Sequence, residues 1–112
     1  NRNANLASLL FSILSFHTDS NLIIGVDMDI QILRLPQVIK ATGLARSTVY
    51  LRIEQGLLPR PISLGGKSVG WPVEEITKIN AARISGMSDS QIIELVKKLE
   101  QEREKFKEIC DG

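Results

Sequence analysis

The stretch TGLARSTVYLRIEQGLLPRPISLGGKSVGW, residues 42–71, decides the fold of this chain. Within thirty residues it holds a glycine-containing turn, a ten-residue amphipathic segment, two further prolines and a Gly-Gly pair. Prolines stop helices and glycines favour tight turns, so the elements here must be short and sharply turned. Four side chains of the stretch are basic and one is acidic. This pattern predicts two short helices and a hairpin with a basic surface.

The first two helices are predicted from their end signals. Leu35-Pro36 opens a helix, because proline suits the first helical turn, and Gly43 ends it with the left-handed residue that a tight turn needs. A second helix runs from about Arg46 to Gln55 and is closed by Gly56. Its buried stripe is predicted from apolar residues that recur every four positions: Val49, Ile53 and Leu57. Two short helices joined by such a turn form a helix-turn-helix.

A small hairpin follows the second helix. Pro59 and Pro61 prevent the helix from continuing. The segments ISL and SVGW flank GGK and read as two short strands around a tight turn. We call this hairpin, residues 62–71, the wing. Trp71 is assigned to the core, where it would join the wing to the next helix.

Two more helices complete the prediction. Pro72 starts a third helix with Glu74 and Glu75 in its first turn, where the helix dipole favours acids. Its predicted apolar face consists of Val73, Ile76, Ile79 and Ile84, and Gly86 ends it. The sequence from Ser88 to Gln91 is a capping box that opens a long helix to about Ile109. The fold class is therefore mainly α with a small β-hairpin: a winged helix-turn-helix plus a long C-terminal helix.

The last helix leaves two alternatives open. Heptad-related apolar residues form a narrow seam along it: Ile92, Leu95, Leu99 and Phe106. Such a seam could pack against the helix's own domain. It could equally pair with the same helix of a second copy to form a homodimer.

Three domains are expected: an N-terminal extension (1–28), the winged helix-turn-helix (29–86) and the C-terminal helix (87–112). The apolar run Leu6–Phe16 reads mainly as a docking helix. A secretory signal is one alternative, although no small-x-small cleavage pattern follows. A non-native upstream segment is the other, since Met28 stands just ahead of the first well-patterned element. The run is too short to span a bilayer, so no membrane partner is expected.

Composition excludes several classes of protein. Cys110 is the only cysteine, so an intrachain disulfide and a cysteine-based zinc site are ruled out. The single histidine, His17, cannot build a metal cluster, and no phosphate-binding loop or nucleophile motif is present. We therefore expect a cytoplasmic protein that is not an enzyme and needs no cofactor or metal.

Charge distribution points to a polyanion. The formal net charge is only +1, but residues 32–85 hold eight basic and three acidic side chains. The central region thus carries +5 and the remainder −4, which suits a basic module with acidic ends.

Double-stranded DNA is the expected partner, because the second helix of a helix-turn-helix fits the major groove. Arginine can bond guanine through two hydrogen bonds, and hydroxyl groups suit phosphate oxygens. Arg60 at the base of the wing and Lys67 at its tip are further candidates for the DNA backbone. The predicted DNA-binding residues are Arg46, Ser47, Thr48, Tyr50, Leu51, Arg52, Arg60 and Lys67.

The segments LRLPQVIKATGLARSTVY, GLLPRPISLGGKSVGW and PVEEI resemble the AlpA family of phage and mobile-element regulators. That family is related to MerR-like winged helix-turn-helix proteins and to phage excisionases. The resemblance covers about residues 32–83. It implies a small DNA-binding protein of a phage or integrative element that activates integrase transcription, or that binds an attachment site and favours excision. RNA polymerase or integrase would be its protein partner.

The chain departs from the family pattern at two places that matter for the site. Ala45 stands where the family usually has serine, so the second helix lacks a side-chain cap. Leu51-Arg52 stands where family members usually show a basic residue followed by an apolar one. By helical phase Leu51 faces away from the Val49/Ile53 stripe and so toward DNA, where it could touch a thymine methyl, which leaves open which of the two reads bases. A different class also stays open, namely a protein-interaction module whose winged-helix scaffold binds no DNA.

Overall fold

The computed structural model describes residues 30–111, and residues 31–111 of these belong to one compact unit, Gln31–Gly112. The expectations for residues 1–28, including the docking helix at Leu6–Phe16, lie outside the described residues. The elements are, in chain order, β1 (Ile32–Leu33), α2 (Leu35–Thr42), α3 (Arg46–Glu54), β2 (Ile62–Ser63), β3 (Val69–Pro72), α4 (Val73–Ser85), α5 (Asp89–Gln101), the 3₁₀-helix η1 (Glu102–Lys105) and α6 (Phe106–Asp111). This composition confirms the expected fold class.

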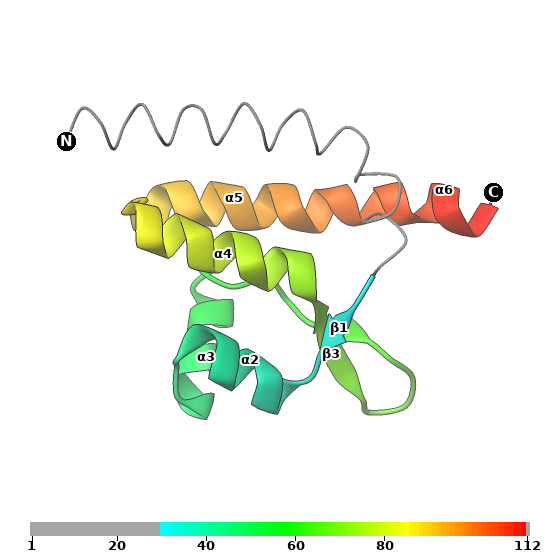
Figure 1. The fold of residues 1–112 in the computed structure, drawn as a ribbon, viewed down its shortest axis with the longest axis horizontal. Coiled ribbons are helices and arrows are strands. Elements are labelled where there is room, and N and C mark those ends of the chain that lie inside the picture. The colour runs from blue at the N-terminus through cyan, green and yellow to red at the C-terminus, as the bar shows by residue number, and fades with distance from the viewer. Residues whose placement is uncertain (1–29, 112) are drawn as a thin grey trace, which may run out of the picture. The chain divides into compact units, whose positions relative to one another are not determined.

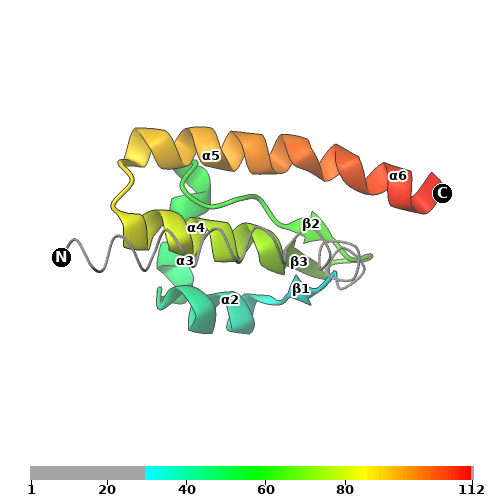
Figure 2. The same cartoon turned by 45° about the horizontal axis from the view of Figure 1, so that its top comes forward.

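Helix α4 is the middle layer of the unit. Figures 1 and 2 both place it between α2 on one side and α5 on the other, and Figure 2 shows α3 passing beside α4 toward α5. All of these layers contribute to one core, whose buried apolar residues are Val38, Val49, Leu57, Leu58, Trp71, Ile76, Ile79, Ala82, Ile92, Val96 and Leu99. The C-terminal helix α5 therefore packs within the same unit as the helix-turn-helix.

The helix-turn-helix forms where the sequence predicts it. Gly43 ends α2 with φ 74°, a left-handed conformation that glycine adopts without strain. Helix α3 ends at Glu54, one residue before the predicted end. Leu57 is buried as expected, but it lies beyond the end of α3. The left-handed turn at Gly56 (φ 79°), and not the periodicity of the helix, directs it into the core.

The wing gains a third strand that the sequence analysis missed. Strands β2 and β3 pair antiparallel, with Ile62 opposite Gly70. Strand β1 then pairs with the other edge of β3, so the strand order is β1-β3-β2. A two-residue strand leaves no periodicity to detect, and β1 exists only because the chain entering α2 runs beside β3.

Pro72 and Ile84 differ from their predicted places. Pro72 is the last residue of β3 and precedes α4, so the third helix begins one residue later than expected. Ile84 is 87% exposed and does not belong to the apolar face of α4. The buried positions continue at spacing three through Ile76, Ile79 and Ala82. Ile84 follows Ile79 by five residues, which turns it to the opposite side of the helix.

The capping box at Ser88 forms as predicted: the Gln91 backbone N–H donates to Ser88 Oγ (3.3 Å) and the Ser88 N–H donates to Gln91 Oε1 (3.0 Å). The helix that it opens is not continuous to Ile109. It narrows to the 3₁₀ turn η1 at Glu102–Lys105 and resumes as α6. None of the helices within residues 30–111 is long and apolar enough to cross a membrane.

Position 70 requires glycine because β1 pairs with β3 there and leaves no room for a Cβ atom. A Cβ at this position would lie 2.5 Å from Ile32 Cγ2 and 2.9 Å from the Leu33 carbonyl oxygen. We expect Gly70→Ala to lower the free energy of unfolding by about 1–3 kcal/mol, because a backbone atom cannot move aside as a side chain can. Urea denaturation of Gly70→Ala beside Ser68→Ala, an exposed position of the same hairpin, measures this. Equal stability of the two variants would contradict the strand contact.

The amino end of α3 lacks a cap. Ala45 occupies the N-cap position with extended backbone (φ −70°, ψ 159°) and provides no side-chain acceptor. Ala45→Ser should raise the free energy of unfolding by about 1 kcal/mol, since a serine hydroxyl at this position accepts a backbone N–H of the first turn. Thermal and urea denaturation check this. Ala81→Ser, the same change at an exposed position inside α4, should be neutral or slightly destabilising, and a similar gain there would refute the capping explanation.

Candidate nucleic-acid interface

Helix α3 presents one buried and one exposed face. Val49 is fully buried and Ile53 is half-buried against the core. On the opposite face, Ser47 is exposed, Tyr50 is 43% exposed and Leu51 is 50% exposed. Large apolar and aromatic side chains on an exposed helix face are available for contact with a partner.

The amino end of this helix favours an anion. Arg46 is exposed at its first position, Thr48 is half-buried, and no acidic residue lies in the first turn. Because Ala45 offers no acceptor, backbone N–H groups of the first turn lack a side-chain cap. The positive end of the helix dipole, these N–H groups and Arg46 together form a surface to which a phosphate oxygen can bond.

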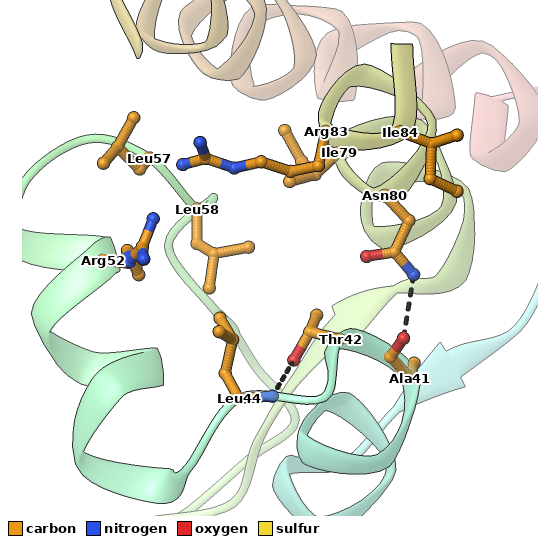
Figure 3. A pocket seen from close by; sticks show the side chains of 10 residues that line it. All are labelled: Ala41, Thr42, Leu44, Arg52, Leu57, Leu58, Ile79, Asn80, Arg83 and Ile84. Atoms are coloured by element: carbon orange, nitrogen blue, oxygen red, sulfur yellow. Dashed lines mark hydrogen bonds between the residues drawn. The ribbon is translucent and has the colours of Figure 1, made fainter. Parts of the chain in front are cut away.

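Arg52 lies on a different side of α3 from Leu51. It is half-buried and lines a groove of about 390 Å³ between the helix-turn-helix and α4. Figure 3 shows the Arg83 side chain crossing this groove from α4 toward α3, above Leu58. Arg83 is also paired with Asp89 at 3.0 Å. The structure thus separates two adjacent candidates: Leu51 shares the exposed face with Ser47 and Tyr50, and Arg52 does not.

The wing presents Lys67 at its turn. The turn is closed by hydrogen bonds from the Leu64 N–H to the Ser68 carbonyl (2.8 Å) and from the Ser68 N–H to the Gly65 carbonyl (3.1 Å). Gly65 and Gly66 have φ values of 103° and 58°. Figure 1 shows the wing and the α2–α3 pair extending from the side of α4 that is opposite to α5.

Arg60 has an exposed side chain, and its backbone makes two hydrogen bonds to side chains of the C-terminal helical segment. The Arg60 N–H donates to Glu100 Oε2 (2.8 Å), and the Arg60 carbonyl accepts from Arg103 Nη2 (2.6 Å). The preceding carbonyl, that of Pro59, accepts from Trp71 Nε1 (2.9 Å). Trp71 is fully buried, which agrees with the core role predicted for it.

Arg103 is half-buried and forms an ion pair with the buried Glu75. Its Nε and Nη2 donate to the two carboxylate oxygens of Glu75 at 2.8 and 2.7 Å, and Glu75 is only 4% exposed. The hydrogen bond that Arg103 donates to Glu75 raises the pKa of the Arg103 guanidinium above its ordinary value, against the effect of partial burial. Glu75 therefore has a structural role beyond the favourable helix-dipole position expected for it: it joins the first turn of α4 to η1 through Arg103.

Three of the four seam residues, Ile92, Leu95 and Leu99, pack in or against the core of their own unit. Ile92 and Leu99 are buried in the core of their own unit, together with Val96. Leu95 and Phe106 are half-buried, and the ammonium of Lys105 lies 5.2 Å from the Phe106 ring. The buried members of the seam are thus occupied by contacts within the chain.

Sequence reasoning missed Glu75, Glu100 and Arg103. Each lies in a charged helical segment where the usual expectation is a solvated side chain. A weak signal existed in Pro59-Arg60-Pro61, where a single backbone N–H stands between two prolines and needs an acceptor.

Comparison with known proteins gives the following matches. The family model "Prophage CP4-57 regulatory protein (AlpA)" matches residues 31–84. The "Uncharacterized protein ORF88" of Enterobacteria phage P4 is 48% identical over 54 residues, which are 48% of this chain and 61% of that protein. The "DNA-binding transcriptional activator AlpA" of Escherichia coli (strain K12) is 43% identical over 53 residues, 42% of this chain and 76% of that protein. No solved structure matches the chain.

The Glu75–Arg103 ion pair should contribute to the free energy of unfolding. We expect Arg103→Met to cost about 3 kcal/mol, because it leaves a buried carboxylate without its partner. The double variant Glu75→Leu/Arg103→Met should recover most of this loss, since neither charge is then buried. Urea denaturation measures both. Lys107→Met is the control, as it breaks an exposed pair with Glu104 (2.9 Å) and should cost well under about 1 kcal/mol. Equal loss in the single and double variants would contradict the explanation.

Proposed function

The chain belongs to the AlpA family of phage regulatory proteins, and on that premise we propose that it is a sequence-specific DNA-binding regulator of a phage or integrative element. The observation that carries the proposal is the exposed face of α3. Its buried side is fixed to the core by Val49, so Arg46, Ser47, Tyr50 and Leu51 are presented together to a partner. A helix exposed along one face with a basic amino end suits the major groove of DNA.

Each group on α3 has a distinct role in this proposal. Arg46 bonds a guanine through two hydrogen bonds, which is worth about 1–3 kcal/mol of discrimination. Ser47, Thr48 and Tyr50 donate to phosphate oxygens and fix the register of the helix. Leu51 contacts a thymine methyl group, because it shares the exposed face with Ser47 and Tyr50 whereas Arg52 lines the groove beside α4.

The wing supplies a second contact in this proposal. Lys67 at the turn and Arg60 at the base both have exposed side chains and bond backbone phosphates. Neither appears among the ion pairs of residues 30–111. Their charges are thus available for an anionic partner.

We assign the regulatory role to transcription first, with integrase as the regulated gene. The Escherichia coli relative is named as a transcriptional activator, which supports this choice. Activation requires contact with RNA polymerase. The second candidate is an excisionase that binds the attachment site next to integrase. The side of α5 and α6 away from the core is the surface that we assign to either protein partner, or to a second copy of the chain.

The test is a gel-shift titration of the purified protein at two salt concentrations in the presence of competitor DNA. The fragments are the integrase promoter and the attachment site of the element that encodes the protein. We expect a specific shift that weakens steeply with salt, because bound phosphates release counterions. Arg46→Ala should weaken binding by roughly 5- to 150-fold. Lys67→Ala should lower the slope of log affinity against log salt by about 0.9.

Lys97→Ala is the matched control, since it removes one exposed positive charge from α5. It should leave both affinity and salt slope nearly unchanged. Binding no tighter than to competitor would overturn the proposal and favour a protein-interaction module built on the same scaffold. Preferential binding to the promoter supports the activator, and preferential binding to the attachment site supports the excisionase.

A further inference from the structure

We propose that Glu100 and Arg103 are positioning residues that hold the wing in the orientation needed to reach DNA. The proposal rests on the DNA-binding function proposed above and adds a role for the C-terminal helix in it. Both residues lie at the junction of α5 and η1, and both bond the backbone of Arg60, two residues before β2 begins. We call these two hydrogen bonds the Arg60 clamp.

The backbone of this segment has few ways to be fixed. Pro59 and Pro61 have no N–H, so the Arg60 N–H is the only backbone donor among residues 59–61. That donor bonds the Glu100 carboxylate at 2.8 Å, and none of the strands within residues 30–111 pairs with residues 59–61. A charged acceptor makes a stronger hydrogen bond than a neutral one. Glu100 therefore fixes the chain where it enters the wing.

Arg103 connects the clamp to α4. Its guanidinium bonds the Arg60 carbonyl and both oxygens of the buried Glu75 in the first turn of α4. The wing leaves β3 directly into that same turn, because Pro72 precedes Val73. One strand of the wing is thus tied to α4 by chain connectivity and the other through Arg103. Without the clamp, the β2 side would still be attached through its ladder with β3, the Trp71–Pro59 bond and the buried Leu58 and Pro59, but no bond would hold Arg60 itself.

Loss of the clamp should affect most the position of the turn of the wing, which carries Lys67. Lys67 lies at the far end of the hairpin, seven residues after Arg60. A small rotation at the base moves the tip further than it moves the base, so the Lys67 contact is the most sensitive to the clamp. The contacts of α3 should not depend on it, because α3 is fixed separately through Val49.

A double-mutant cycle tests this. Glu100→Ala should weaken DNA binding by roughly threefold to tenfold and lower the salt slope by about 0.9, the effect of one lost phosphate contact. On this background Lys67→Ala should have little further effect, whereas Arg46→Ala should retain its full effect. Glu100→Gln keeps an oxygen acceptor and should restore most of the affinity.

Whether Glu100→Ala lowers or raises the affinity for DNA distinguishes a positioning role from a simple charge effect. Removal of an acidic charge alone should strengthen binding to DNA, and Glu108→Ala, an exposed acid on α6, measures that effect. Weaker binding by Glu100→Ala with equal or tighter binding by Glu108→Ala supports the proposal. Unchanged or tighter binding by Glu100→Ala, with Lys67→Ala additive, overturns it while leaving the proposed function intact.

A measurement without DNA keeps the proposal falsifiable if the wild-type protein fails to shift any fragment. Hydrogen exchange followed by NMR should be faster in Glu100→Ala at the Arg60 and Leu64 amides and unchanged at the Val49 amide of α3. An unchanged exchange rate at Arg60 would overturn the proposal by itself. Absence of a specific shift by the wild-type protein would instead overturn the proposed function.

Discussion

A carboxylate that is only 4% exposed constrains much of this structure. A buried charge is tolerated only when it is paired and hydrogen-bonded, so Glu75 requires the two-fold contact with Arg103. That contact brings η1 against the start of α4 and places the remaining Arg103 N–H groups beside the Arg60 carbonyl. The exposed Lys105–Glu74 contact (3.3 Å) lies at the same junction but is a weak constraint, since both groups are about half-exposed.

The local signals of the sequence predicted the helices well. Gly43, Gly56 and Gly86 all adopt positive φ values at the ends of α2, α3 and α4, where glycine was expected to stop each helix. The capping box at Ser88 also forms as expected. These signals are reliable because they depend on neighbouring residues only. The sequence could not reveal β1 or the 3₁₀ turn, since both depend on contacts set by the tertiary packing. The exposure of Ile84 could have been predicted, because its spacing of five from Ile79 turns it away from the buried face.

The candidate site was predictable in part. The basic and hydroxyl residues of α3 could be named from their position after the turn, and helix phase already turned Leu51 away from the buried stripe. That Arg52 is half-buried beside α4 could be seen only in the folded chain. Glu100 and Arg103 could not be found, because charged residues in a segment such as KKLEQEREKFKE resemble any solvated helix. Their partners lie 28 to 43 residues away in the chain, at Glu75 and Arg60.

The family match ends at residue 84, whereas both clamp residues lie beyond it. The shape of the hairpin is thus a property of the shared segment, and its attachment is a property of the helix that follows. Substitutions in that helix can alter the tilt of the hairpin without changing any residue that faces the partner. Related proteins could therefore diverge in what they bind while the residues of the helix-turn-helix and the wing stay the same.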